Sequence, residues 1–161
     1  MFKNRLLISF LLLIAVPFMS SAQTNSLVIP AYAFYPMSDD AEWFANLGEI
    51  RIEGTSPDGK LRASVFLPEG AIIKKVILRY TTRGGDITFT MTLYRRNMYT
   101  DVEQVVTNMT PPQTGADFQN FATYSIAYRT VNNSGYCYYI VIDMPLGLGL
   151  PWIAGVKILY E

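Results

Sequence analysis

The sequence predicts an all-β protein, an antiparallel β-sandwich or barrel of eight or nine short strands. Apolar and polar residues alternate in successive segments from about Leu47 to Tyr160, a two-residue period that is typical of half-buried strands. Turn-forming residues separate these segments, as they do in sandwiches and barrels. The chain of 161 residues contains no histidine, which excludes Ser-His-Asp and Cys-His catalysis and every histidine-ligated metal site.

The first 22 residues have the pattern of an export signal. Two basic residues lie near the start, residues 6–19 form an apolar stretch, and small residues at 20–22 precede Gln23. A membrane-spanning helix, the alternative, needs roughly 20 apolar residues, and this stretch is shorter and contains Pro17. We therefore expect a signal peptide, secretion to the periplasm or the cell exterior, and one β-domain over residues 23–161.

The charge balance argues against nucleic acid as a partner. The chain carries 13 basic and 13 acidic residues, and cleavage after residue 22 would remove two of the basic ones. No basic stripe remains that would follow a phosphate backbone. A second membrane span is not expected either, because glycines and Pro151 interrupt the apolar residues 146–160.

The N-terminal part should begin with an edge strand. Leu27–Phe34 has strand character, but Pro30 has no amide to donate to a ladder, so this strand belongs at an edge or carries a bulge. Met37–Asn46 is polar and then aromatic, and we interpret it as a loop or a single helical turn. Leu47–Glu53 and Leu61–Leu67 resume the alternation and are predicted strands.

The middle of the chain contains a strong hairpin signal. Ile72–Thr81 is a predicted strand, and Arg83–Asp86 follows it with a glycine pair that supplies the positive φ of tight turns. Ile87–Tyr94 then alternates strictly, with apolar residues at odd positions and threonine or tyrosine at even ones. We therefore predict a β-hairpin made of these two strands.

The C-terminal part should supply the centre of a sheet. Asp101–Val106 and Phe121–Tyr128 are predicted strands, separated by a loop at Thr110–Asp117 that contains proline and glycine. Tyr136–Asp143 is apolar at successive positions, which is consistent with a strand covered on both faces. Trp152–Tyr160 is the last predicted strand.

The single cysteine, Cys137, excludes a disulfide within the chain. It lies inside an apolar segment, where a free cysteine behaves as a small apolar residue, so we predict a buried thiol. An intermolecular disulfide is the alternative.

Six short segments, spread in order over most of the chain after residue 22, form a pattern that is typical of a known family. They are Val28–Ala31, Leu67–Ala71, Gly85–Thr88, Asn132–Tyr136, Tyr138–Ile142 and Gly155–Ile158. In these segments the chain resembles an uncharacterised family of small secreted bacterial proteins. The resemblance implies a β-sandwich of jelly-roll type in an extracellular setting and carries no catalytic residues. Relatives in that family often hold a charged residue where this chain has Val141, which implies an unusually apolar face here.

Aromatic residues are the first candidate binding site. The chain has 11 tyrosines, 9 phenylalanines and 2 tryptophans, and tyrosine and tryptophan provide rigid amphipathic area for sugars or proteins. Those predicted to lie in loops or opposite the apolar row are Tyr35, Trp43, Tyr94, Tyr99 and Trp152. The alternative is that aromatics fill the core, since strands favour them.

A threonine row is the second candidate. Thr88, Thr90 and Thr92 lie beside Arg95 and Arg96 and would form a flat hydrogen-bonding face for a glycan, or one wall of a subunit interface. The alternative is an ordinary solvent-exposed face of an antiparallel sheet.

Acidic residues give little support to metal binding or catalysis. The spacing of Asp39, Asp40 and Glu42 matches no calcium loop, and calcium needs six or more oxygen ligands. Two carboxylates in one cleft would permit glycoside hydrolysis without histidine, but no pair is placed together by the sequence. We therefore expect no metal, no cofactor and no enzymatic activity.

The leading functional hypothesis is a secreted, non-catalytic interaction or structural domain that self-associates. Its basis is the apolar character of both faces of Tyr136–Ile142 and of the last strand, which requires a covering layer. The covering layer would be either a second sheet or a partner subunit. The candidate interface residues are Tyr139, Val141 and Trp152. The alternative hypothesis is a monomeric carbohydrate-binding module that uses exposed tyrosine and tryptophan.

Overall fold

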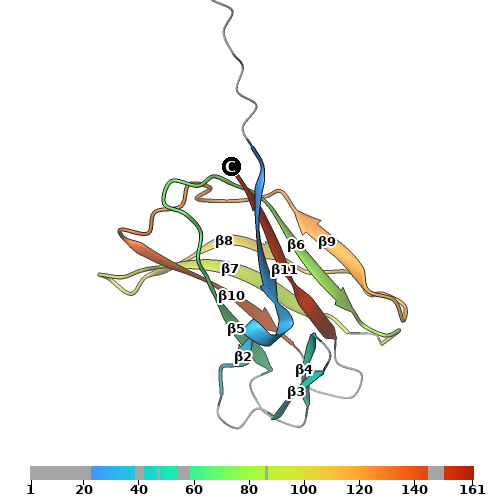
Figure 1. Cartoon of the computed structure of the whole chain (residues 1–161). Coiled ribbons are helices and arrows are strands. Elements are labelled where there is room, and N and C mark those ends of the chain that lie inside the picture. The colour runs from blue at the N-terminus through green and yellow to red at the C-terminus, as the bar shows by residue number, and fades with distance from the viewer. Residues whose placement is uncertain (1–22, 39–41, 47, 54–58, 86, 145–150) are drawn as a thin grey trace, which may run out of the picture.

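The computed structural model describes residues 23–38, 42–46, 48–53, 59–85, 87–144 and 151–161 (Figure 1). The predicted export signal, residues 1–22, lies outside this part of the chain. Within the described residues, no helix has the length and apolarity needed to cross a membrane.

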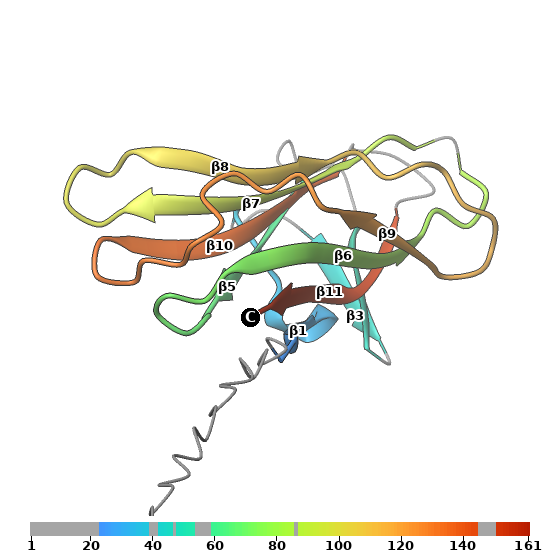
Figure 2. The same cartoon turned by 90° about the horizontal axis from the view of Figure 1, so that it is seen from above.

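Two antiparallel sheets pack face to face, as Figures 1 and 2 show. Sheet A contains β1 (Asn25–Pro30), β3 (Glu42–Asn46), β4 (Glu49–Glu53), β6 (Ile73–Thr81), β9 (Gln119–Thr123) and β11 (Trp152–Tyr160). Sheet B contains β2 (Tyr35–Pro36), β5 (Lys60–Val65), β7 (Thr90–Asn97), β8 (Glu103–Met109) and β10 (Tyr136–Asp143). A short 3₁₀ helix, η1 (Ala31–Ala33), links β1 to β2. The all-β sandwich predicted from the sequence is confirmed.

The strand order is that of a jelly roll. Sheet A runs β3-β4-β11-β6-β9, with β1 also paired to β11, and sheet B runs β2-β5-β10-β7-β8. From β4 to β11 the chain therefore alternates between the sheets, except at β7 and β8, which are neighbours in sheet B. The predicted jelly-roll topology is confirmed, with β1, β2 and β3 as additions to its eight strands.

The core lies between the sheets and follows from the alternation. Val76, Leu78 and Tyr80 of β6 point inward and meet the odd-numbered residues of β7 and the even-numbered residues of β10. The largest fully buried side chains are Tyr80, Phe34, Phe89, Ile50, Leu61, Ile73, Leu78, Met91, Leu93, Ile140 and Ile142. Burial of this apolar area is the main force that holds the two sheets together.

β1 is an edge strand, as Pro30 predicted. It pairs only with β11 among the described strands, and Pro30 lies opposite Gly155. Gly155 has φ +149°, and a β-carbon there would lie 2.6 Å from the carbonyl oxygen of Ile29. Glycine at this position therefore lets β1 approach the bulged part of β11.

The predicted hairpin of residues 72–94 is wrong. β6 pairs with β11 and β9 in sheet A, whereas β7 pairs with β10 and β8 in sheet B. Arg83 and Gly84 do form a turn with positive φ, and the amide of Gly85 donates to Thr82 O at 2.9 Å. After this turn the chain passes from sheet A to sheet B instead of pairing with β6, and Phe89 is buried in the core between the sheets.

The prediction of a loop or helical turn at Met37–Asn46 is wrong for its second half. Glu42–Asn46 is strand β3 and pairs with β4 through all five residues. Gly48, with φ +87°, supports the turn between them. The mixed polar and aromatic composition concealed this strand, which among the described strands pairs with β4 alone.

Candidate functional site

Cross-strand register gathers polar and aromatic side chains on the outer face of sheet B. Arg62 of β5 lies opposite Val141 of β10, and Val141 lies opposite Thr92 of β7. In the next row Tyr139 lies opposite Tyr94. Directly opposed residues of antiparallel strands share a face and have Cβ atoms about 5 Å apart, so these five side chains form one surface.

Tyr139 is the centre of this surface. The guanidinium carbon of Arg62 lies 3.9 Å from the Tyr139 ring centroid, and Tyr94 stacks on the same ring at 5.5 Å with an interplanar angle of 23°. The Tyr139 hydroxyl donates to a carboxylate oxygen of Glu103. With these neighbours Tyr139 is only 3% exposed, although it points away from the core.

The surroundings raise the pKa of the Tyr139 hydroxyl. Burial contributes most, and the hydrogen bond and charge of Glu103 act in the same direction, while Arg62 and Arg96 oppose them. The Tyr139 hydroxyl therefore keeps its proton, and stays a hydrogen-bond donor to Glu103, at pH values where an exposed tyrosine would ionise.

A shallow groove of about 230 Å³ opens over this row. It is lined by Met37, Lys60, Arg62, Thr90, Thr92, Tyr94, Glu103, Tyr139, Val141 and Asp143. Lys60 and Asp143 form an exposed ion pair at 3.8 Å, and the Thr92 hydroxyl donates to the side-chain oxygen of Asn108 at 3.3 Å. The groove combines half-buried ring area with donors and acceptors of both charges.

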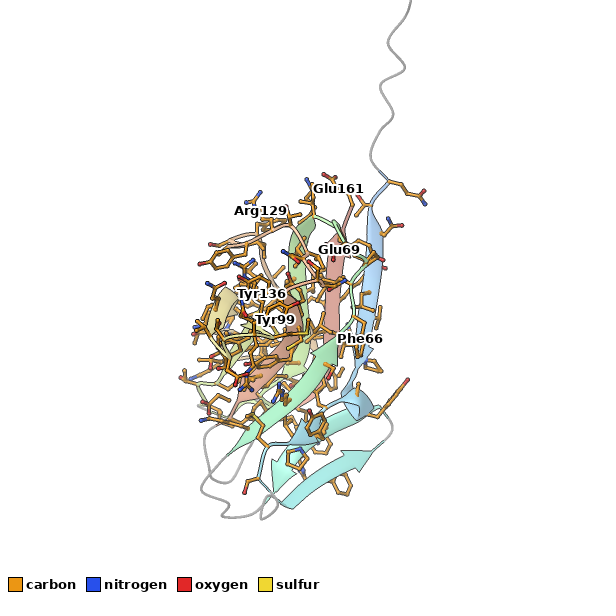
Figure 3. The ribbon with its side chains drawn as sticks, turned by 90° about the vertical axis from the view of Figure 1, so that its left-hand side faces the viewer. Phe66, Glu69, Tyr99, Arg129, Tyr136 and Glu161 are labelled. Atoms are coloured by element: carbon orange, nitrogen blue, oxygen red, sulfur yellow. The ribbon has the colours of Figure 1, made fainter. Side chains whose placement is uncertain are left out.

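A second aromatic surface lies at the loop end of the sandwich (Figure 3). Phe66 and Tyr99 are 83% and 81% exposed, and the Tyr99 hydroxyl donates to Ser134 O at 3.3 Å. The Arg95 guanidinium lies 4.3 Å from the Tyr136 ring. A hollow of about 390 Å³ beside Phe66 and Tyr136 has few charged groups.

The five predicted ligand-binding residues fall in different places. Tyr35 is half exposed and lies opposite Arg62 on sheet B, next to the groove, and Tyr94 lines the groove itself. Tyr99 belongs to the loop end. Trp152 is 8% exposed, covered by the guanidinium groups of Arg51 and Arg83 at 4.3 and 3.9 Å. The side chain of Trp43 lies outside the described residues.

Two further expectations need correction. Cys137 is exposed on the outer face of sheet B rather than buried, because alternation along β10 directs it to the same side as Tyr139. Arg95 and Arg96 were both expected beside the threonine row, but only Arg96 lies on that face. Arg95 packs on Tyr128 and Tyr136 on the inner side.

The candidate interface is covered within one chain. The inner face of β10 packs on sheet A, and on its outer face Tyr139 is covered by Arg62 and Tyr94. Val141 lines the groove and is partly exposed. The two-sided apolar character of β10 therefore has an explanation that needs no partner subunit.

Sequence reasoning did not select Arg62 or Glu103. The alternation along residues 61–67 does direct Leu61 and Ala63 to the core and Arg62 to the outer face of the same strand. The outward orientation of Arg62 was therefore predictable from the sequence. Its position over Tyr139, 77 residues further along the chain, depends on strand pairing.

The described residues contain no group of three acidic or cysteine side chains that could hold a metal ion. The acidic candidates Asp39 and Asp40, and the side chain of Glu42, lie outside them.

No family model matches the chain, and no curated protein sequence does. Solved structures do match. They include the CBM22 and GH10 modules of a Clostridium thermocellum xylanase in complex with xylohexaose, at TM-score 0.53 and 15% identity, over 86% of this chain and 28% of that one. The family 6 carbohydrate-binding module of a laminarinase from Zobellia galactanivorans matches at TM-score 0.51 and 15% identity, over 83% and 98%.

A third match is a CBM36 domain of a multidomain xylanase from the hindgut metagenome of Trinervitermes trinervoides, at TM-score 0.50 and 8% identity, over 84% of this chain and 96% of that one. The chain thus spans about a quarter of the xylanase and nearly the whole of the two isolated modules. At these identities the matches show that the chain shares a β-sandwich fold with carbohydrate-binding modules.

Proposed function

We propose that residues 23–161 form a non-catalytic carbohydrate-binding domain that acts outside the cytoplasm, with its site in the groove of sheet B. The observation that carries the proposal is the row of Arg62, Tyr139 and Tyr94 beneath a groove of polar side chains.

The chemistry of the groove suits a sugar chain. Pyranose rings have apolar faces that stack on aromatic and guanidinium planes, and hydroxyl groups that need donors and acceptors at their rims. Tyr94 supplies the ring area inside the groove, and Tyr35 supplies more beside it. Arg62, Glu103 and the threonines supply directional hydrogen bonds, of which those to charged groups are the stronger.

The fold supports the same proposal, because two of the three matched structures named above are carbohydrate-binding modules and the third contains one. Self-association is the weaker hypothesis, since Tyr139 and Trp152 are covered by arginines of their own chain.

Isothermal titration of residues 23–161 with xylohexaose, laminarin oligosaccharides and a wider panel of neutral glycans tests the proposal. Tyr94→Ala should weaken binding of the active glycan by roughly five- to thirtyfold, since one stacked ring contributes on the order of 1–2 kcal/mol. Tyr99→Ala, at an exposed tyrosine outside the groove, is the matched control and should bind normally. If Tyr99→Ala lost glycan binding and Tyr94→Ala did not, the site would lie at the loop end instead. If no glycan of the panel bound, the proposal would be contradicted.

A further inference from the structure

The outer face of sheet A faces the viewer in Figure 1. It carries a hollow that is larger than the groove of sheet B. The hollow measures about 540 Å³ and is lined by Val28, Lys75, Ile77, Arg79, Asn120, Ala122, Ala154, Gly155, Val156 and Lys157. The residues come from β1, β11, β6 and β9, so the hollow crosses four adjacent strands. It lies on the opposite side of the sandwich from the sheet B groove.

Small side chains create the hollow. Gly155, Ala154 and Ala122 leave room between the longer side chains of β6 and β11. Its floor is apolar, since Val28 is 60% exposed and Ile77 is partly exposed. An apolar floor that crosses several strands offers area to a flat or extended ligand.

Three basic side chains surround this floor. Lys75 and Arg79 are four residues apart on β6, about 13 Å along the strand, and Lys157 of β11 lies opposite Ile77 between them. No carboxylate of the described residues pairs with any of the three, whereas the neighbouring Lys74 is paired with Glu161. Unpaired positive charge is therefore concentrated around the hollow.

Aromatic rings flank the hollow at both ends of β6. The Lys75 ammonium lies 4.7 Å from the Tyr124 ring centroid, and the Arg79 guanidinium lies 5.7 Å from that of Phe118. Tyr124 is 63% exposed. Each end thus pairs a cation with a ring, and Lys157 lies midway.

We propose that this hollow is a second binding site, for the anionic groups of an acidic polysaccharide. The cations would pair with successive carboxylate or sulfate groups, while Val28, Ile77 and Tyr124 would contact the apolar faces of the sugar rings. Charge complementarity selects an anionic ligand. The apolar floor and the limited length favour a sugar chain over duplex nucleic acid, whose phosphates need a longer basic stripe.

The site is independent of the sheet B groove. A domain with two sites on opposite faces would join two glycan chains, one neutral and one acidic. Each site therefore has its own variants and its own probe.

Affinity electrophoresis in polygalacturonate and in dextran sulfate tests the proposal, and methyl-esterified polygalacturonate and dextran serve as neutral counterparts. The protein should be retarded by an acidic polymer and not by its neutral counterpart, and the acidic polymer that acts identifies carboxylate or sulfate. Retardation should decline as NaCl rises from 0.05 to 0.5 M, because salt screens exposed charges.

Matched variants locate the site. Lys75→Gln, Arg79→Gln and Lys157→Gln together should weaken binding at least tenfold, and Lys157→Gln alone severalfold. Lys74→Gln, which removes an adjacent paired cation, should have little effect, and Tyr94→Ala should leave this binding intact. Equal loss with Lys74→Gln, unchanged binding by the folded triple variant, or equal retardation by neutral polymers would overturn the proposal.

Discussion

The guanidinium of Arg62 and the ring of Tyr139 form a cation–π pair, 3.9 Å from the carbon to the ring centroid, on the outer face of sheet B. The pair explains how a tyrosine that points away from the core is 3% exposed. It also fixes the aromatic row on which the proposed sugar site depends, so its disruption should affect both stability and binding.

Arg62→Met should lower the free energy of unfolding by about 1 kcal/mol, the usual contribution of a partly covered cation–π pair. Methionine keeps an unbranched apolar stem over the ring but removes the charge. Urea denaturation measures the change. Arg79→Met is the comparison, because that guanidinium lies farther from its ring, 5.7 Å from that of Phe118, and should lose less stability. An equal loss in both variants would indicate a general effect of charge.

Tyr139→Phe should change the alkaline stability of the protein. Since the fold raises the pKa of this hydroxyl, the folded state keeps its proton where the unfolded state loses it. Its contribution is intact below pH 10 and declines above it by up to about 1.4 kcal/mol per pH unit. Urea unfolding at pH 9, 10 and 11 should therefore give a shallower decline for Tyr139→Phe than for the parent or for the exposed-site control Tyr32→Phe. Parallel declines would contradict this.

Gly155→Ala should lower the free energy of unfolding by about 2–3 kcal/mol. The new β-carbon would lie 2.6 Å from Ile29 O at φ +149°, and both the close contact and the disfavoured backbone oppose it. Thermal denaturation measures the loss. Gly115→Ala, where a β-carbon meets nothing within 4 Å, should be nearly neutral. A stable Gly155→Ala variant would mean that β1 moves away from β11 without cost.

Thr82→Val should destabilise the protein by about 1–3 kcal/mol. The buried Thr82 hydroxyl donates to Thr114 O at 2.8 Å and accepts from Thr114 N at 2.9 Å, and valine leaves both backbone groups without that partner. Chemical denaturation gives the value, with Thr88→Val at an exposed position as the control. No difference between the two would show that water replaces the lost bonds.

Cys137 should react with a thiol reagent in the native protein. Its side chain is exposed on sheet B, so labelling by a disulfide reagent in buffer should proceed at a rate within about tenfold of that in denaturant. A rate lower by a thousandfold or more would indicate that the thiol is protected in solution.

The strands themselves were largely predictable. Tyr136–Asp143 and Trp152–Tyr160 were assigned with the bounds that the structure has, because a long regular alternation flanked by turn residues is a local signal. β3 was missed because its residues mix polar and aromatic types, and its strand conformation comes from pairing with β4.

The candidate site was predictable only in part. Tyr35 and Tyr94 were selected because they were expected in loops or on the face opposite the apolar row, and both lie at the groove. Trp152 was selected on the same argument, yet Arg51 and Arg83 cover it. Whether an outward-pointing ring is exposed depends on which long side chains lie over it, and for Trp152 these come from other parts of the chain.

The sequence by itself determined an all-β chain, the absence of histidine chemistry, and the core-facing side of regularly alternating strands such as β6, because these depend on composition and on the two-residue period. Tertiary structure decided that β6 and β7 enter different sheets and that Arg62 covers Tyr139. Which strands pair depends on the burial of the whole core, a sum over contacts far apart in the chain, and no local segment contains that information.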